Sequence, residues 1–177
     1  MPGIWGDGSI MVFYAVCTLT GGESVKLKNM LIVVKDIEKS KAFYRELFGL
    51  QVIMDFGENV ILTEGLVLQE EKLWESFTEK AVVKGGNDAE LYFEENDMDS
   101  FLEKLKNCPW EITYVNPCME HDWGQRVVRF FDPDLHVIEV GEAMDYVARR
   151  FLRSGMSVRD VAEKTQLPET VVGEMCS

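Results

Sequence analysis

A short polar segment of the chain, residues 120–126, concentrates side chains that can bind or transform a small molecule. The imidazole of His121 has an ordinary pKa of about 6.5, so it can exchange protons near neutral pH. The indole of Trp123 can stack on a planar ligand, and the guanidinium of Arg126 can hold a carboxylate or phosphate through two parallel hydrogen bonds. These three residues are therefore candidate ligand-binding residues. The alternative is a loop that only closes a sheet, with Trp123 packed and Arg126 paired to a neighbouring acid.

Two further segments carry polar groups at strand spacing. In an extended segment Tyr92 shares a face with Glu90, while Leu91 points the other way, so Tyr92 is a candidate wall residue beside a polar site. The other histidine, His136, precedes Glu139 by three positions, which in a strand places the two side chains on opposite faces. We therefore expect that His136 and Glu139 do not bind one ion together.

The elements that must position these residues occur twice in the sequence. The stretch FGENVI at residues 56–61 returns as WGQRVV at residues 123–128, and an apolar run ending in Asp36 returns as one ending in Asp97. Each copy predicts a strand, a helix capped by the aspartate, and three further strands. The predicted strands are 30–34, 51–56, 60–63 and 66–69, then 90–94, 112–115, 126–131 and 136–140, and the predicted helices are 37–48 and 99–105. The sequence thus predicts one small βαβββ module built twice, with a ligand site between the copies.

Composition excludes several classes of protein. The 177 residues include 18 Lys and Arg and 31 Asp and Glu, and the net charge of -13 argues against nucleic acid or an anionic membrane as the main partner. No apolar run reaches the roughly 20 residues that span a bilayer. The four cysteines show no CxxC pairing and are typical of free thiols in a reducing cytosol, so we expect a cytoplasmic protein. No nucleophile elbow, P-loop or GxGxxG motif supports a hydrolase, nucleotide-binding or Rossmann protein.

The two ends of the chain are predicted to lie outside the paired modules. Residues 1–24 contain an apolar run without a preceding basic segment, so we interpret them as an N-terminal extension that is not part of the core. The modules then span about 25–80 and 86–142. Residues 143–177 form a C-terminal helical tail, in which apolar residues recur at helical spacing from Met144 to Leu152. The segment that follows resembles a helix-turn-helix pair that lacks the third helix of a stable DNA-binding module. We expect the tail to dock on the barrel or on a partner subunit.

Two motifs in this order resemble the vicinal oxygen chelate superfamily, also called the glyoxalase, bleomycin-resistance and extradiol-dioxygenase family. The first is Val33-Val34-Lys35-Asp36-Ile37-Glu38-Lys39-Ser40, followed by Ala42-Phe43-Tyr44 and Phe48-Gly49-Leu50. The second is Phe131-Asp132-Pro133-Asp134, followed by Val137-Ile138-Glu139-Val140. The resemblance covers residues 26–142 and implies an α+β fold of two paired βαβββ modules that form an incomplete barrel around a cavity, with the C-terminal helical extension beyond it. It also implies a homodimer.

The resemblance further implies a metal site with one ligand from the first and one from the last strand of each module. Transferred to this sequence, the ligands are Asn29, Gln69, Glu90 and Glu139, which departs from the family's usual histidine pattern. Such an all-oxygen set suits a hard ion better than zinc. The expected cofactor is therefore either a divalent metal ion, among Mn, Mg, Ni and Zn, or none, with the polar groups satisfying one another.

Two functions remain open on this evidence. The first is a glyoxalase-like enzyme of the lyase or isomerase type, in which a divalent metal polarises a carbonyl or enediolate substrate and Glu139 or Glu90 moves a proton. The second is a metal-free protein of the bleomycin-resistance type that sequesters or senses a small molecule through Trp123, Tyr92 and Arg126. The departure from the histidine pattern favours the second over classical zinc or nickel chemistry.

Overall fold

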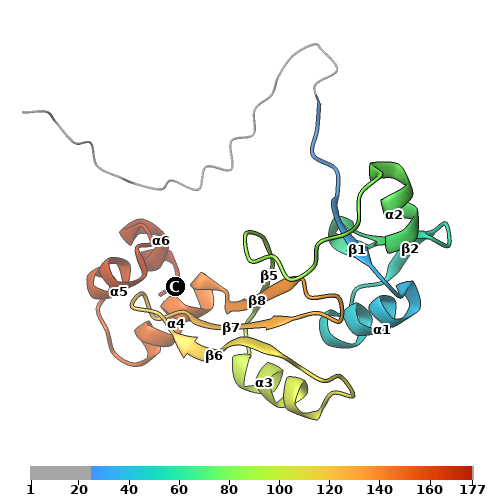
Figure 1. Cartoon of the computed structure of the whole chain (residues 1–177). Helices are drawn as coiled ribbons and strands as arrows, with labels where there is room; N and C mark the ends of the chain where they lie inside the picture. Colours follow the sequence, from blue (N-terminus) through green and yellow to red (C-terminus); the bar gives the residue numbers. More distant parts are fainter. Residues whose placement is uncertain (1–24, 177) are drawn as a thin grey trace, which may run out of the picture.

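The computed structural model describes residues 25–176, and its strands form two open four-stranded sheets. The first sheet has the order β1-β4-β3-β2 and the second the order β5-β8-β7-β6. In each sheet the first strand pairs in parallel with the last strand, and the other pairs are antiparallel. The predicted α+β fold of two βαβββ modules is thus confirmed (Figure 1). The expected N-terminal extension, residues 1–24, lies outside the described residues.

The first module follows the predicted order of elements. These are β1 (Met30–Val34), α1 (Ile37–Phe48), β2 (Val52–Asp55), β3 (Asn59–Leu62), β4 (Leu66–Glu70) and a short helix α2 (Glu71–Thr78). The helix α1 starts where the sequence predicted, because the Asp36 carboxylate accepts a hydrogen bond from the Lys39 amide at 3.0 Å. This cap sets the direction in which the chain leaves β1.

The second module repeats the pattern with one longer strand. Its elements are β5 (Glu90–Glu95), α3 (Met98–Asn107), β6 (Tyr114–Glu120), β7 (Arg126–Phe131) and β8 (Val137–Glu142). The Asp97 carboxylate caps α3 as predicted, accepting from the Ser100 amide at 3.0 Å. The prediction for β6, residues 112–115, was wrong: the strand starts at Tyr114 and runs through Pro117. A proline is tolerated there because β6 is the outer strand of its sheet and needs no ladder bond on its free side.

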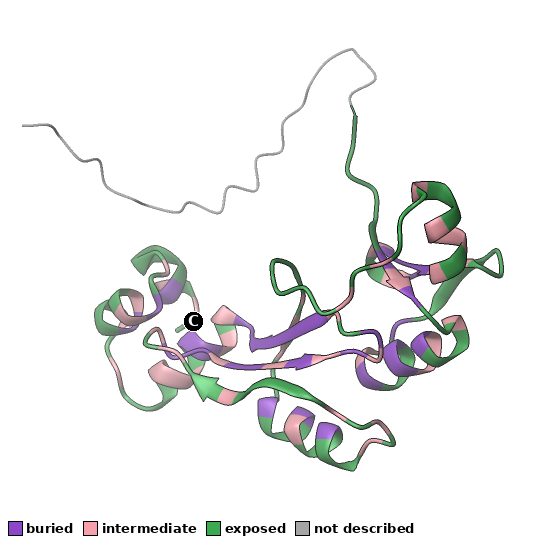
Figure 2. Ribbon diagram, in the orientation of Figure 1, coloured by how far each residue is buried: buried purple, intermediate pink, exposed green. Residues whose placement is uncertain are grey.

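The two modules share one apolar core, which lies between the sheets and the helices α1 and α3 (Figure 2). The Phe48 ring of α1 stacks on Phe93 of β5 with the ring centroids 4.0 Å apart. Phe43 meets Trp110 edge to face at 5.5 Å. Fully burying one such apolar side chain contributes roughly 1.5 to 3 kcal/mol. The helix α1 therefore fastens the first module to the second.

Three helices follow the second sheet: α4 (Met144–Arg153), α5 (Val158–Thr165) and α6 (Glu169–Glu174). They pack around the fully buried Ala148, Val161 and Val172. The expectation that the helix pair lacks a third helix was wrong, because α4 supplies it. The position of a recognition helix is occupied by α6, which has six residues, two of them glutamates, and no basic side chain. Its two carboxylates would repel the phosphates of a nucleic acid.

Candidate functional site

Strand pairing brings four polar side chains of the second module onto one side of its sheet. Residues paired directly across a ladder point to the same face, and Glu139 pairs with Tyr92 on one side and Arg129 on the other. Glu90 is two residues from Tyr92 and shares this face. The neighbours of Glu139 in β8, Ile138 and Val140, are 0% and 1% exposed in the core on the opposite side. We call the side with Glu90, Tyr92, Arg129 and Glu139 the polar face.

Arg129 lies between the two carboxylates of the polar face. Its guanidinium forms an ion pair with Glu139, and its Nε lies 3.4 Å from Oε2 of Glu90. The Glu139 side chain is only 9% exposed. Burial raises the pKa of the Glu139 carboxyl, Arg129 opposes this, and the nearby Glu90 adds to it. A cation that belongs to the protein therefore already occupies the space between Glu90 and Glu139.

A chain of hydrogen bonds links the predicted loop residues to the polar face. The Trp123 indole donates to Oε1 of Gln125 at 3.0 Å, and Nε2 of Gln125 donates to the Tyr92 hydroxyl at 3.2 Å. The His121 ring stacks on Trp123 with the ring centroids 4.3 Å apart. The structure thus brings His121, Trp123 and Tyr92 together through Gln125. Burial, followed by the nearby Glu94, raises the pKa of the Tyr92 hydroxyl, so it stays protonated.

A glycine in β8 makes room for this chain of hydrogen bonds. A Cβ added at Gly141 would lie 2.9 Å from Nε2 of Gln125 and 3.2 Å from the Tyr92 hydroxyl. Real Cβ atoms do not approach that closely, so any larger residue would push the two side chains apart. A glycine inside a strand often marks a close approach of this kind.

Arg126 points to the other side of the sheet. Its guanidinium donates to Oε1 of Glu142 at 2.8 and 3.0 Å and to Asp99 of α3 at 2.8 Å. Glu142 is fully buried, and these bonds raise the pKa of Arg126 further above its usual value. All of this charge is used in holding α3 and β8 together, so we do not carry Arg126 into the proposed site.

The first-module residues of the expected metal site are engaged elsewhere. Oε1 of Gln69 accepts from the Asn59 amide at 2.8 Å, and Nε2 of Gln69 donates to the Glu58 carbonyl at 2.9 Å. Asn29 precedes β1, and its Oδ1 lies 3.6 Å from where a Cβ on Gly65 would be. Within residues 25–176 no hydrogen bond or ion pair joins Asn29 or Gln69 to the acids of the polar face.

The donor set does not fit a divalent metal ion. In the part of the chain that the structure describes, no three His, Cys, Asp or Glu side chains come together in a metal-binding group. The two carboxylates that lie close together, Glu90 and Glu139, already share the Arg129 guanidinium. A divalent ion could take both carboxylates as ligands only by displacing that guanidinium, which would break both ion pairs.

The C-terminal helices hold the loop that carries His121 and Trp123. The Arg150 guanidinium of α4 donates to the Gly124 carbonyl at 2.5 Å and to the buried Glu142 at 3.1 Å. The Phe151 ring lies against Gly124, where an added Cβ would come within 2.3 Å of it. Lys164 of α5 donates to the Asp122 carbonyl at 3.3 Å. Of the two expected docking places, the barrel or a partner subunit, these contacts show the first, on the second module.

The sequence prediction missed Arg129 of the polar face and two residues beside it, Gln125 and Gly141. Arg129 stands between Val128 and Phe130 in the predicted strand 126–131, so strand alternation alone places it opposite the core. Gly141 interrupts a strand of large side chains, which is a second available signal. Gln125 has no such signal, because its role depends on the fold of the loop.

Comparison with known proteins gives one family. The model of the glyoxalase-like domain matches residues 27–145. A protein of unknown function from Agrobacterium tumefaciens is 34% identical, with a TM-score of 0.59 over 69% of this chain and 97% of its own. No match was found among the curated proteins.

More distant solved structures share the fold alone. The fosfomycin resistance protein FosX of Listeria monocytogenes is 18% identical, with a TM-score of 0.51 over 68% of this chain and 94% of its own. A variant of that protein was solved with Mn(II) and a dihydroxypropylphosphonic acid. A lactoylglutathione lyase from Agrobacterium tumefaciens is 19% identical, with a TM-score of 0.52 over 68% of this chain and 95% of its own.

Proposed function

Because the chain belongs to the glyoxalase-like domain family, we propose that it binds a small molecule on the polar face without a metal ion. The observation that carries this proposal is the Arg129 guanidinium between Glu90 and Glu139. It pairs with both acids that the family resemblance assigned to a metal and offsets one of their two negative charges. The competing metal-dependent lyase would need Arg129 to leave both carboxylates before an ion could enter.

The charge and shape of the polar face indicate the ligand class. Its carboxylates, Glu90, Glu94 and Glu139, outnumber its one guanidinium, so it attracts a cation more than an anion. The rings of Tyr92 and Trp123 border the same face, and aromatic faces attract cations. We propose a small planar cation as the ligand, stacked on an aromatic ring and paired with a carboxylate.

Benzamidine is a suitable probe for this proposal, with benzoate as the probe of reversed charge. We expect calorimetric titration to show benzamidine binding to the wild type, and Tyr92→Leu and Glu139→Gln each to weaken it about tenfold. Phe56→Leu is the matched control, since Phe56 stands at the sequence position equivalent to Trp123 and is 66% exposed. Equal binding of benzoate, or unchanged benzamidine affinity in both site variants, would contradict the proposal.

The proposal includes the homodimer that the family resemblance implies. Edge strand β2 exposes Val52, Ile53 and Met54, and edge strand β6 exposes Tyr114, Val115 and Met119. Exposed apolar side chains gathered on sheet edges support a partner surface. Sedimentation at several concentrations gives the mass, and a monomer throughout would remove this part of the proposal.

No helix within residues 25–176 is long and apolar enough to cross a membrane.

A further inference from the structure

A cavity of about 510 Å³ lies where the two modules meet and shares Glu90 with the edge of the polar face. Its walls come from β1, the helix α2, the connection 80–89 and the turn before β8. Apolar side chains form most of the lining, among them Ile32, Trp74, Val82, Leu91 and Leu135. The volume falls within the range of roughly 300 to 1,000 Å³ that small-molecule sites occupy.

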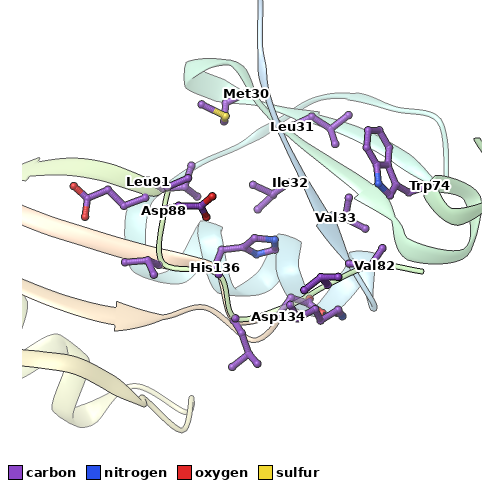
Figure 3. A pocket seen from close by; sticks show the side chains of 18 of the residues that line it. Met30, Leu31, Ile32, Val33, Trp74, Val82, Asp88, Leu91, Asp134 and His136 are labelled. Carbon is purple, nitrogen blue, oxygen red and sulfur yellow. Dashed lines mark hydrogen bonds and ion pairs between the residues drawn. The ribbon is translucent and has the colours of Figure 1, made fainter. Parts of the chain in front are cut away.

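One polar side chain of the lining is held in a fixed orientation by a buried carboxylate. Nδ1 of His136 lies 2.8 Å from Oδ2 of Asp132, whose side chain is 0% exposed. The same carboxylate accepts from the Tyr44 hydroxyl at 2.8 Å and from the His136 amide at 2.8 Å. Figure 3 shows the His136 ring pointing into the cavity toward Ile32.

The hydrogen bonds around Asp132 also fix which ring nitrogen of His136 accepts. These donors, His136 first among them, lower the pKa of Asp132 despite its burial, so the carboxylate is ionised and can only accept. Nδ1 of a neutral His136 must therefore carry the proton, which leaves the Nε2 lone pair free. An imidazole in this state accepts a hydrogen bond from a hydroxyl group.

A strained residue stands beside the histidine. Leu135 has a φ of 69°, in the left-handed region that favours glycine, and its side chain lines the cavity. The structurally equivalent residue of the first module, four positions before Gln69, is Gly65 with a φ of 76°. A large side chain kept where the backbone favours glycine is typical of functional sites.

The charges at the cavity argue against an ionic ligand. Nζ of Lys84 lies 2.7 Å from Asp134 and also forms an ion pair with Glu71. Lys80, Asp88 and Glu90 also line the cavity, so charges of both signs stand at its rim, while the apolar walls do not solvate any charge. The lining is suited to an uncharged molecule with one hydroxyl group.

We propose that this cavity is a second small-molecule site for a neutral phenol, whose ring packs among Ile32, Trp74 and Leu91 and whose hydroxyl donates to Nε2 of His136. Asp132 is a positioning residue that holds the imidazole. The site differs from the polar face in ligand and in lining: the two share Glu90, but Tyr92, Arg129 and Glu139 do not line this cavity.

The test uses p-cresol and 4-methylanisole, which differ only in replacing the hydroxyl hydrogen by a methyl group. Binding is followed by NMR at the Trp74 indole N–H, assigned with Trp74→Phe. We expect p-cresol to move the Trp74 signal and 4-methylanisole to bind much more weakly. His136→Phe keeps the ring volume and the backbone amide, and should weaken p-cresol about tenfold.

Leu135→Gly is a second variant that tests the wall without touching the histidine. The backbone at this position suits glycine, so the fold is retained and a severalfold loss of p-cresol affinity is expected. Equal binding of the two probes, equal p-cresol affinity in the wild type and His136→Phe, or a shift confined to Trp123 would each overturn the proposal. The benzamidine experiment on the polar face is independent of all three outcomes.

Discussion

In the first sheet the residue paired with Gln69 across β3 is Asn59, and in the second sheet the residue paired with Glu139 across β7 is Arg129. The first pair is a neutral hydrogen bond of 2.8 Å, whereas the second is an ion pair. The two sheets have the same strand order, so the backbone alone does not decide which face takes a ligand. Side chains at equivalent positions give the second sheet charge that the first sheet lacks.

The parallel strands differ in a second way. Gln69 pairs with Val33, three residues before the helix cap Asp36, whereas Glu139 pairs with Tyr92, five residues before the cap Asp97. The structural counterpart of Glu90 is therefore Leu31, and Asn29 lies two residues further out. A strand advances about 3.3 Å per residue, so this offset moves Asn29 about 7 Å away from the position equivalent to Glu90.

The largest expected effect comes from removing the cation of the second sheet. Arg129→Met removes the ion-pair partner of the buried Glu139 carboxylate. It should lower the free energy of unfolding by about 2 kcal/mol at pH 7. The matched variant Asn59→Leu removes a neutral hydrogen bond and should cost about 1 kcal/mol. Urea unfolding measures both. Equal losses of unfolding free energy in the two variants would show that the Arg129–Glu139 ion pair stabilises the fold no more than the neutral Asn59–Gln69 hydrogen bond.

A smaller effect on the free energy of unfolding is expected at the two turn positions with a left-handed backbone, Gly65 and Leu135. Gly65→Ala forces a side chain onto a φ of 76° and places its Cβ 3.3 Å from the Lys28 carbonyl, so we expect a loss of roughly 1 to 2 kcal/mol. Leu135→Gly relieves the same strain in the second module and should change stability by less than that. A greater loss from Leu135→Gly than from Gly65→Ala would mean that leucine packing, not backbone strain, dominates there.

The smallest effect is a dependence on pH. The pKa of Glu139 is raised in the folded state, so ionising it costs stability. The free energy of unfolding of the wild type, relative to Glu139→Gln, should fall as the pH rises from the usual glutamate pKa of about 4.3 through the raised pKa. A difference that grows with pH would show that Arg129 outweighs burial at this carboxyl.

Much of the fold was predictable because it depends on local signals. The caps Asp36 and Asp97 and the turn Asp132-Pro133-Asp134 fix element boundaries through bonds within four residues. The strand prediction failed at β6, which was placed at residues 112–115 but runs from Tyr114 to Glu120.

The site was predicted less well because it depends on strand register. The repeat of FGENVI as WGQRVV aligns Arg126 with Asn59, but the observed pairing places Arg129 there, three residues later. An odd offset turns a side chain to the other face, so Arg126 joined Glu142 instead of the polar face. The family resemblance named Glu90 and Glu139, and strand alternation placed Tyr92 on the face of Glu90; the structure puts these three side chains on one face, and their role stays a prediction.

The most direct test of the account asks whether Arg129 stands in place of a metal ion. Protein purified without chelator is examined by elemental analysis, and the wild type, Glu139→Ala and Arg129→Met are titrated with Mn²⁺, Ni²⁺ and Zn²⁺ by calorimetry. The account predicts no stoichiometric metal in the wild type or in Glu139→Ala, and measurable Mn²⁺ binding only when Arg129 is removed. Stoichiometric metal in the wild type that is lost in Glu139→Ala would contradict it and establish the metal-dependent enzyme as the better model.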